Sequence, residues 1–336
     1  MLTLGIESSC DDLSMALVQE GQVLSNVTSS QAAYHAPHGG VVPEIASRQH
    51  LEALESTLEF ALKQAGRSLQ DIEALAVTYA PGLVGSLLVG LNFAKALSFA
   101  LKIPFIGVHH IEAHLFSAFI ENPLNYPFLG FAVSGGHTHL YQVESLGKIT
   151  LLGHTVDDAA GEALDKVAKR LGLGYPGGPI IDRLSEEGDK KAFSFAIPQV
   201  KAGPLYTSFS GIKTKAVDYI EKEEASPKVS THFKADMAAS FQEAVVRSLE
   251  VLMERALAEK DFKQVAVAGG VACNRLLRNR LQTLCQKRNL NLALPSPRYC
   301  TDNGAMVAFL GEKYLTAGLT SPISLNAQAR KTLGAL

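Results

Sequence analysis

Hydrophobic residues recur with two different periods along this chain, and the alternation between those periods predicts an α/β fold. Near the amino terminus, short apolar runs are separated by polar turns, which is typical of antiparallel strands. From about residue 43 to 65, apolar side chains recur every three or four positions, which predicts a helix with one buried face. The predicted strands of the first half are residues 2–6, 13–18, 23–27, 74–78 and 105–108, and the predicted helices are 43–65, 83–101 and the segment after 108.

The second half of the chain repeats this plan. It also opens with a predicted hairpin and continues with alternating helices and strands, which indicates a duplicated α/β unit with a ligand cleft between two lobes. The predicted strands are 128–133, 138–143, 265–268 and 291–294, and the predicted helices are 237–256, 274–287 and the segment after Asp302.

These repeats predict two domains. We expect an N-terminal lobe at residues 1–109, completed by the C-terminal helix at about 303–336, and a C-terminal lobe at 110–302. The stretch at about 186–230 is rich in lysine and short on periodicity, which predicts an insertion.

The charge, cysteine spacing and hydropathy of the chain exclude several classes of protein. A net charge of −2 excludes a uniformly basic surface, so contact with nucleic acid requires local patches or a partner. The four cysteines show neither C-x-x-C spacing nor the pattern of a disulfide scaffold, which favours a reducing compartment. No secretory signal precedes the first strand, and the apolar segment 83–101 contains Asn92 and Lys95, which favours a buried helix over a membrane span. We therefore expect a cytoplasmic protein that makes no use of a membrane.

The segment His109-His110-Ile111-Glu112-Ala113-His114 carries the first candidate chemistry, because His110 and His114 share one helix face. One interpretation is a pair of ordinary core histidines. A zinc peptidase would need H-E-x-x-H, and moving the glutamate one position turns Glu112 by roughly 100° away from the metal. A third interpretation is a metal that positions a group for transfer, which needs a distant carboxylate ligand and a phosphate cradle.

Three glycine pairs are candidates for that cradle. Gly135-Gly136 lies at a hairpin tip, where glycines are able to take positive φ and the absence of Cβ atoms lets backbone N–H groups approach a phosphate closely. Gly269-Gly270 lies between a strand and a helix, and Gly177-Gly178 precedes a helical segment, so both pairs offer helix amino termini. Each pair alone is more often an ordinary turn, and their joint occurrence favours a nucleotide site.

Eight motifs, in order, give the chain a family resemblance. They are Gly5-Ile6-Glu7-Ser8-Ser9-Cys10-Asp11-Asp12, the His109–His114 segment, Val133-Ser134-Gly135-Gly136-His137-Thr138, Gly161-Glu162-Ala163-Leu164-Asp165-Lys166, Gly174-Tyr175-Pro176-Gly177-Gly178-Pro179, Phe209-Ser210-Gly211-Ile212-Lys213-Thr214, Gly269-Gly270-Val271-Ala272-Cys273-Asn274 and Cys300-Thr301-Asp302-Asn303-Gly304-Ala305. From residue 3 to about 315 the chain resembles the universal tRNA threonylcarbamoyladenosine transferase family, formerly called O-sialoglycoprotein endopeptidases, in its bacterial and organellar branch.

The resemblance implies a fold and a reaction. The fold is that of the actin, Hsp70 and sugar-kinase superfold (ASKHA), which agrees with the duplication predicted above. The reaction transfers threonylcarbamoyl from threonylcarbamoyl-AMP to N6 of the adenosine 3′ of the anticodon in tRNAs reading ANN codons, and it releases AMP. An ATP-hydrolysing chaperone or a sugar kinase of the same superfold is the main rival, and neither needs the two histidines.

The resemblance also implies roles for individual residues. The metal ligands are His110, His114 and Asp302, holding one divalent ion, Fe(II) or alternatively Zn(II). From the residues alone, Asp302 is equally a helix N-cap. The substrate-binding residues are Val133, Ser134, Gly135, Gly136 and His137 for the phosphate and threonylcarbamoyl portion, Asp165, Gly178 and Asp182 for the ribose, and Asn274 for the adenine end.

A base that accepts the proton of the attacking amine would help this reaction. The candidates are Glu7, Asp11, Asp12, His137 and His139, and we select Asp11 from its place in the first hairpin turn. The resemblance implies three macromolecular partners: tRNA, a metal-free paralogue (TsaB-like) that forms a heterodimer through the amino-terminal domain, and a small P-loop ATPase (TsaE-like).

Overall fold

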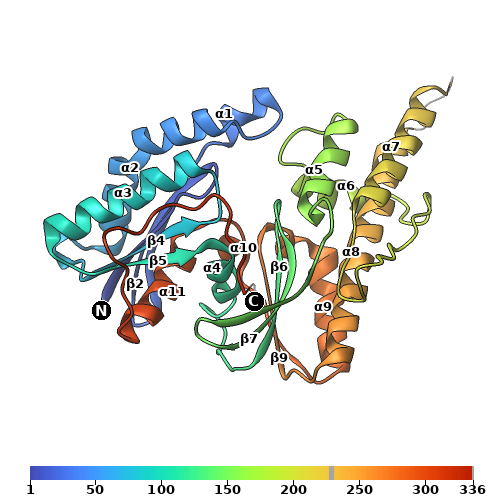
Figure 1. The fold of residues 1–336 in the computed structure, drawn as a ribbon. Coiled ribbons are helices and arrows are strands. Elements are labelled where there is room, and N and C mark those ends of the chain that lie inside the picture. Colours follow the sequence, from blue (N-terminus) through green and yellow to red (C-terminus); the bar gives the residue numbers. More distant parts are fainter. Residues whose placement is uncertain (227–230, 335–336) are drawn as a thin grey trace. The chain divides into compact units, whose positions relative to one another are not determined.

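The computed structural model describes residues 1–226 and 231–334. The chain divides into two compact units (Figure 1): unit 1 is Met1–Leu124 with Pro295–Leu336, and unit 2 is Asn125–Leu294. Each unit contains one five-stranded sheet.

The sheet of unit 1 has the order β3-β2-β1-β4-β5. The first three strands form an antiparallel meander, and β4 and β5 add in parallel to β1. All three predicted amino-terminal strands are therefore confirmed. The elements of this unit are β1 (Leu2–Glu7), β2 (Asp12–Gln19), β3 (Gln22–Ser30), α1 (Ala32–His35), α2 (Pro43–Ala65), β4 (Ala74–Ala80), α3 (Val84–Leu101), β5 (Phe105–His109), α4 (His110–Ser117), α10 (Pro297–Cys300) and α11 (Gly304–Thr316).

Unit 2 repeats the same connectivity, with the strand order β10-β9-β6-β7-β8. Here β6, β7 and β8 form the meander, and β9 and β10 add in parallel. The matching strand orders of the two sheets thus confirm the predicted duplication. The elements are β6 (Phe128–Val133), β7 (Thr138–Ser145), β8 (Lys148–His154), α5 (Ala160–Arg170), α6 (Gly177–Leu184), α7 (Ser210–Glu224), α8 (Phe233–Glu259), β9 (Gln264–Ala268), α9 (Arg275–Lys287) and β10 (Asn291–Ala293).

Two elements of unit 2 escaped the sequence analysis. Strand β8 lies at the sheet edge and only one of its residues is buried, so it lacks a clear apolar alternation. Helix α7 lies inside the stretch predicted as an insertion. Its buried residues Ile212, Ala216 and Ile220 follow a four-residue spacing that the surrounding lysines and glutamates obscure.

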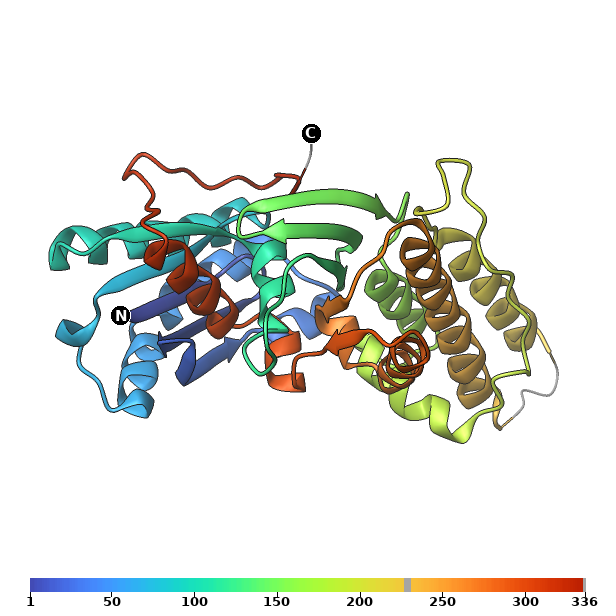
Figure 2. The same cartoon turned by 90° about the horizontal axis from the view of Figure 1, so that it is seen from below.

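Helix α11 and helix α3 cover opposite faces of the unit 1 sheet. A Cβ on Gly5 of β1 would lie 2.4 Å from the Ala308 nitrogen of α11. Gly90 of α3 instead lies against Ile6 of β1 and against Ser8, which follows that strand. Successive strand residues point to opposite faces, so the two helices lie on opposite sides (Figure 2). The absence of a side chain at Gly5 lets α11 pack directly on the strand backbone, which fixes the start of α11.

The boundary between the units differs from the predicted one. Helix α4 and Asp302 were expected in a lobe spanning residues 110–302, and both belong to unit 1. The physical reason is that α4 continues directly from β5 and packs against α11, a helix almost 200 residues later in the chain.

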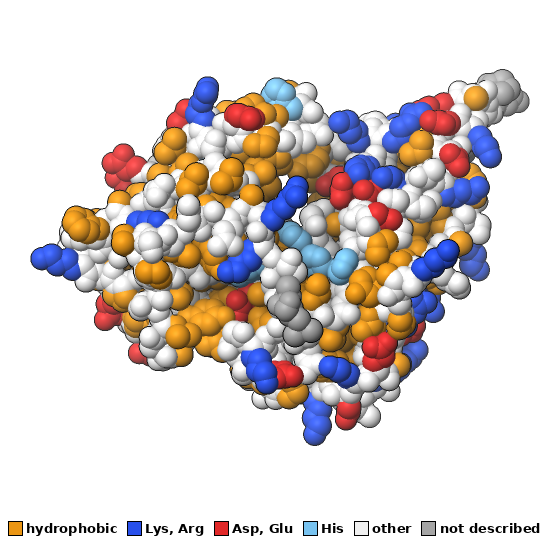
Figure 3. Space-filling model, viewed as in Figure 1, with side chains coloured by type: hydrophobic (Ala, Val, Ile, Leu, Met, Phe, Trp, Pro, Cys, Tyr) orange, Lys and Arg blue, Asp and Glu red, His pale blue; other side chains and the backbone are white. Residues whose placement is uncertain are grey.

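Helix α3 is the one described helix that is long and apolar enough to cross a membrane by length and composition. The sequence predicts that it is buried. In the structure only one face is buried against the sheet and α2, and Phe99 at the other face is 83% exposed. Figure 3 shows hydrophobic side chains at the surface of this part of unit 1.

Substituting Gly5 by alanine tests the contact between α11 and the sheet. Because the new Cβ would overlap the backbone of α11, we expect Gly5→Ala to lower the free energy of unfolding by about 1–3 kcal/mol. Denaturant titration measures the change. Gly40→Ala is the control, since nothing lies within 4 Å of its Cβ. Equal stability of the two variants would show that the close packing is absent.

Candidate active site

The two histidines of α4 are placed by the junction between β5 and the helix. His109, the last residue of β5, is the N-cap, and its Nδ1 accepts a hydrogen bond from the Ile111 backbone N–H at 3.3 Å. All eight residues of α4 are buried. The His110 and His114 rings meet edge to face, with centroids 4.6 Å apart and planes at 84°. The i, i+4 spacing therefore brings both rings to one buried face, as the sequence predicts.

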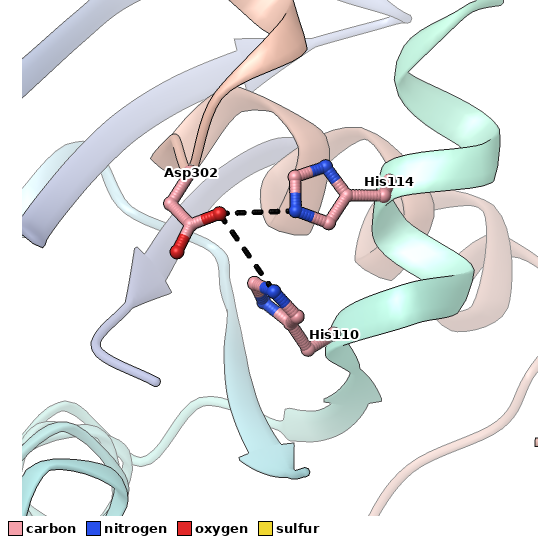
Figure 4. Close-up of side chains that lie close together, drawn as sticks. All are labelled: His110, His114 and Asp302. Atoms are coloured by element: carbon pink, nitrogen blue, oxygen red, sulfur yellow. Dashed lines mark hydrogen bonds and ion pairs between the residues drawn. The ribbon is translucent and has the colours of Figure 1, made fainter. Parts of the chain in front are cut away.

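Asp302 faces both rings from the loop between α10 and α11 (Figure 4). Its Oδ1 lies 3.0 Å from His114 Nε2 and 3.7 Å from His110 Nε2. The alternative role of helix N-cap belongs to Asn303, whose Oδ1 accepts from the Met306 N–H at 2.9 Å. Asp302 is thus not the cap, and its carboxylate is directed at the histidines.

The loop that carries Asp302 is anchored by side chains of β2 and β3. At the start of α11, the Gly304 N–H donates to Ser14 Oγ at 2.8 Å, and the Ala305 N–H donates to Asn26 Oδ1 at 3.1 Å. A helix amino terminus leaves such groups without intrahelical partners, so these bonds fix both the start and the direction of α11. Asp302 precedes that fixed start by two residues, and its position follows from it.

The three side chains fit a metal ion. One nitrogen from each ring and one oxygen of Asp302 all lie within 4.8 Å of one another. Ligand atoms about 2.1 Å from a metal lie about 3.0–3.4 Å from each other at octahedral or tetrahedral angles, close to the separations from Asp302 to the two rings. Two imidazoles with one carboxylate suit Fe(II) or Zn(II) and leave coordination positions for substrate oxygens.

Glu7 contacts the His110 ring at Nδ1, the nitrogen that does not face Asp302. The carboxylate of Glu7 is fully buried, and its Oε2 lies 3.1 Å from His110 Nδ1. The same oxygen accepts from Thr78 Oγ1 at 2.6 Å, and Oε1 accepts from the Ser9 N–H at 2.7 Å. A carboxylate that binds Nδ1 leaves Nε2 to face Asp302, which is the orientation that metal-binding histidines adopt.

The charges of this cluster call for a cation. Burial lowers the pKa of His110, but the carboxylates of Glu7 and Asp302 outweigh burial and raise it to about 9. Burial also opposes ionisation of Glu7, and the interaction with His110 outweighs it and lowers the Glu7 pKa. The carboxylates of Glu7 and Asp302 thus both face the buried His110 ring and place negative charge beside it. A divalent ion would compensate that charge.

Glu112 does not take part in this cluster. Its Oε1 accepts a hydrogen bond from the Tyr314 hydroxyl of α11 at 2.5 Å. The glutamate of a zinc peptidase would instead face the metal-bound water. The arrangement therefore contradicts the peptidase interpretation.

In unit 2, the glycine turn at the tip of β6 and β7 is closed by Ser134. Its N–H donates to the His137 carbonyl at 2.8 Å, and its Oγ accepts from the His137 N–H at 3.1 Å. Neither Gly135 nor Gly136 takes a positive φ in this turn. Nothing lies within 4 Å of a Cβ added at either glycine, so their backbone is open to a ligand. Val133 is the last residue of β6 and leads into this turn.

Asp165 and Gly178 meet at the amino terminus of α6. Oδ1 of Asp165 accepts from the N–H groups of Gly177, at 2.7 Å, and Gly178, at 3.2 Å. Burial raises the Asp165 pKa, and these two bonds oppose the rise. Asp165 therefore caps α6 from α5, while Gly178 has open space where a Cβ would be.

Asp182 and Asn274 form one polar network with residues that the sequence analysis did not single out. Asn274 Nδ2 donates to Gln242 Oε1 at 2.7 Å and to Asp182 Oδ1 at 3.2 Å, and Asn274 Oδ1 caps α9 by accepting from Leu277 N–H. Arg275 Nε donates to Asp182 Oδ2 at 2.9 Å. A cavity of about 310 Å³ is lined by Asp182, Gln242 and Arg275.

This network shows what sequence reasoning missed. Gln242 follows Phe241 in the long helix α8, where a buried amide leaves no periodic signal. Arg275 of α9 is paired with Asp182 and Glu186, a contact that only the folded chain shows. Arg280 of the same helix is paired with Glu243 and Glu250. Much of the basic face of α9 is therefore neutralised within the unit.

A Glu7→Gln variant tests the support of His110. Glutamine keeps the shape of the side chain but loses the charge that strengthens the imidazole as a ligand. We expect affinity for Zn(II) or Co(II) to fall about 10–100-fold, measured by titration against a chromophoric chelator. Glu55→Gln, on the exposed face of α2, is the control. Undiminished affinity in Glu7→Gln would remove Glu7 from the site.

The chain is similar in sequence to one family of known proteins. The family model described as tRNA N6-adenosine threonylcarbamoyltransferase matches residues 22–309. Proteins of that name from Syntrophotalea carbinolica and Geobacter sulfurreducens are 51% and 48% identical to this chain. The first match covers 98% of this chain and 96% of the relative, and the second covers 100% and 98%.

Solved structures of lower similarity share the fold. HypF from T. kodakarensis gives a TM-score of 0.62 at 18% identity, over 94% of this chain and 48% of that one. Component A of (R)-2-hydroxyglutaryl-CoA dehydratase from Acidaminococcus fermentans gives 0.54 at 16% identity, over 94% and 99%. These neighbours, with the repeated five-stranded units, place the chain in the duplicated ASKHA fold.

Proposed function

We propose, since this chain belongs to the tRNA N6-adenosine threonylcarbamoyltransferase family, that it transfers threonylcarbamoyl from threonylcarbamoyl-AMP to N6 of the adenosine 3′ of the anticodon in tRNAs reading ANN codons. The amine nitrogen forms a bond to the carbamoyl carbon, the bond from that carbon to the phosphate oxygen breaks, and AMP leaves. The observation that carries the proposal within the structure is the convergence of His110, His114 and Asp302, supported by Glu7.

The metal ligands in this proposal are His110, His114 and Asp302. A divalent ion held by them, Fe(II) or Zn(II), would supply a Lewis acid and a template for substrate oxygens. Contacts within the chain hold His110 Nε2, His114 Nε2 and the Asp302 oxygen close together, which favours binding of an ion with little reorganisation. Burial of both rings excludes water from their far side.

The nucleotide portion binds to groups of unit 2 in this proposal. Val133, Ser134, Gly135, Gly136 and His137 would contact the phosphate and threonylcarbamoyl portion, and the open glycine backbone supports that role. Asp165, Gly178 and Asp182 would contact the ribose, and Asn274 the adenine end. The hydrogen bonds described above already occupy Asn274, which supports a second role for it, that of holding Asp182.

A carboxylate of the first hairpin turn accepts the proton from the attacking amine. Glu7 is less suited to this role than the other candidates, because it is buried and already accepts hydrogen bonds from three groups. Asp11 remains our choice for the base. Asp12 is its rival, because burial, with the charges of Asp302 and Asp11, raises its pKa to about 6, near the value that suits a base at neutral pH.

The partners are tRNA, a metal-free paralogue and a small P-loop ATPase. The exposed apolar residues of α2 and α3 support the paralogue as a heterodimer partner, because Leu51, Phe60 and Phe99 are each more than 60% exposed. Large aromatic side chains at a surface are typical of protein interfaces.

A reconstituted transfer assay tests the function. Purified threonylcarbamoyl-AMP with labelled threonine, tRNA and the partner proteins should give labelled tRNA with the wild-type chain. We expect His110→Ala and Asp302→Ala to lose at least about 100-fold in rate, the scale for loss of a transition-state stabiliser. His38→Ala, at an exposed position in the 3-10 helix Ala36–His38 that follows α1, is the matched control. Full labelling by His110→Ala would refute the proposed metal role, and no labelling by wild type would refute the function.

Asparagine variants separate the two candidate bases in the same assay. If Asp11 accepts the proton, Asp11→Asn should lower the rate of transfer by about 10²–10⁴-fold with little change in metal affinity. Asp12→Asn should then remain within a few-fold of wild type. The opposite order of the two rates would move the assignment to Asp12.

A further inference from the structure

After α11 the chain runs back along unit 1 as an extended segment, residues 318–334, which we call the C-terminal strap (Figures 1 and 2). It bonds to β5 through Ser321, whose N–H donates to the Phe105 carbonyl at 2.8 Å and whose Oγ accepts from the Gly107 N–H at 2.9 Å. Farther on, the Gln328 N–H donates to the Tyr79 carbonyl of β4 at 2.9 Å. The strap therefore crosses the strands that lead to α4.

Leu325 anchors the middle of the strap. Its side chain packs against the hydrophobic core of unit 1, and Lys95 of α3 donates to its carbonyl. Gly107 of β5 makes room for it, since a Cβ at that position would lie 2.3 Å from Leu325 Cδ2. The sheet is thus shaped to receive this segment.

Near its end, at Lys331, the strap contacts His109, the N-cap of α4, which is the helix that carries the two candidate metal ligands. His109 Nε2 lies 3.1 Å from the Lys331 carbonyl, while Nδ1 accepts from the Ile111 N–H. A carbonyl only accepts and a backbone N–H only donates, so the ring is held as the neutral tautomer with its proton on Nε2. Lys331 is itself held, because its ammonium donates to the Tyr79 hydroxyl at 2.6 Å.

We propose that the C-terminal strap positions the metal-binding helix, and that His109, fixed between the Lys331 carbonyl and the Ile111 N–H, is the positioning residue. The inference rests on the proposed metal site, which it extends to residues that touch neither metal nor substrate. His109 immediately precedes His110, so tilting its ring displaces the first turn of α4. The segment 302–331 begins at the third ligand and ends at the cap of the helix that carries the other two.

The contacts between α11 and α4 reinforce this arrangement. The Tyr314 hydroxyl donates to Glu112 in the first turn of α4, between the two candidate ligands. Helix α11, which begins after Asp302, thereby touches α4 directly, and its continuation, the strap, holds the N-cap. One stretch of chain, from Asp302 through α11 to the strap, therefore connects the third candidate ligand to the helix that carries the other two.

Three forms of the chain test the strap. His109→Asn keeps an oxygen that can cap α4 but is too short to reach the Lys331 carbonyl. A chain that ends at Ala327 lacks Lys331 and keeps Leu325 in the core. A chain that ends at Thr332 keeps the Lys331 carbonyl and is the matched control.

The first measurement is hydrogen exchange of the α4 amides in the metal-free protein. We expect exchange at residues 110–114 to become at least about tenfold faster in His109→Asn and in the chain ending at Ala327. Exchange in the chain ending at Thr332 should match wild type. Exchange at the wild-type rate in His109→Asn and in the chain ending at Ala327 would overturn the inference, irrespective of any result on metal binding.

The second measurement is Co(II) binding, followed by the visible absorption of the bound ion. We expect about tenfold weaker binding and an altered spectrum in His109→Asn and in the chain ending at Ala327. If wild type binds Co(II), His110→Ala does not, and both strap variants bind like wild type, the strap inference fails while the metal site stands. If wild type binds no Co(II), the metal site fails, and with it the claim that the strap serves a metal.

Discussion

The candidate site depends on one buried chain of charges, from Glu7 through His110 to Asp302. Glu7 is inaccessible to solvent and accepts three hydrogen bonds, so its charge is tolerated only because these partners replace water. That charge holds His110 with Nε2 directed at Asp302. Removing one partner of such a buried pair typically costs about 3–5 kcal/mol. The cluster therefore constrains the fold as well as the chemistry.

The architecture brings this cluster together from four distant stretches of chain. Glu7 ends β1, Thr78 lies on β4, the histidines follow β5, and Asp302 precedes α11. The strands β1, β4 and β5 are parallel neighbours, so their carboxyl ends meet at one edge of the sheet. Ligand groups commonly gather at that edge in α/β folds. Helix α11 completes the set because Gly5 lets it pack on β1.

Much of this fold could be predicted where local signals agree. Helix α2 runs from Pro43 to Ala65 as predicted, since a proline suits the first helical turn and Gly66 takes the left-handed conformation that ends it. The pairing of His110 with His114 was equally local, because it follows from helical spacing. The repeat of the strand order in unit 2 required only that each half show the same alternation.

Other features depend on contacts that no local pattern records. Asp302 and Asn303 are both good helix caps by type, and the choice between them is made by Ser14 and Asn26, nearly 300 residues earlier. The unit boundary was misplaced for the same reason, since the packing of α4 on α11 helps to assign the histidines to unit 1. Gln242 and the strap contact of His109 likewise exist only in the folded chain.

Anomalous X-ray diffraction from crystals of the metal-loaded protein, recorded at the absorption edge of the bound ion, tests the central claim most directly. The account predicts one strong peak within bonding distance of Nε2 of His110, Nε2 of His114 and Oδ1 of Asp302, with Glu7 still bonded to His110 Nδ1. A peak elsewhere, or coordination through Nδ1 of either histidine, would contradict it.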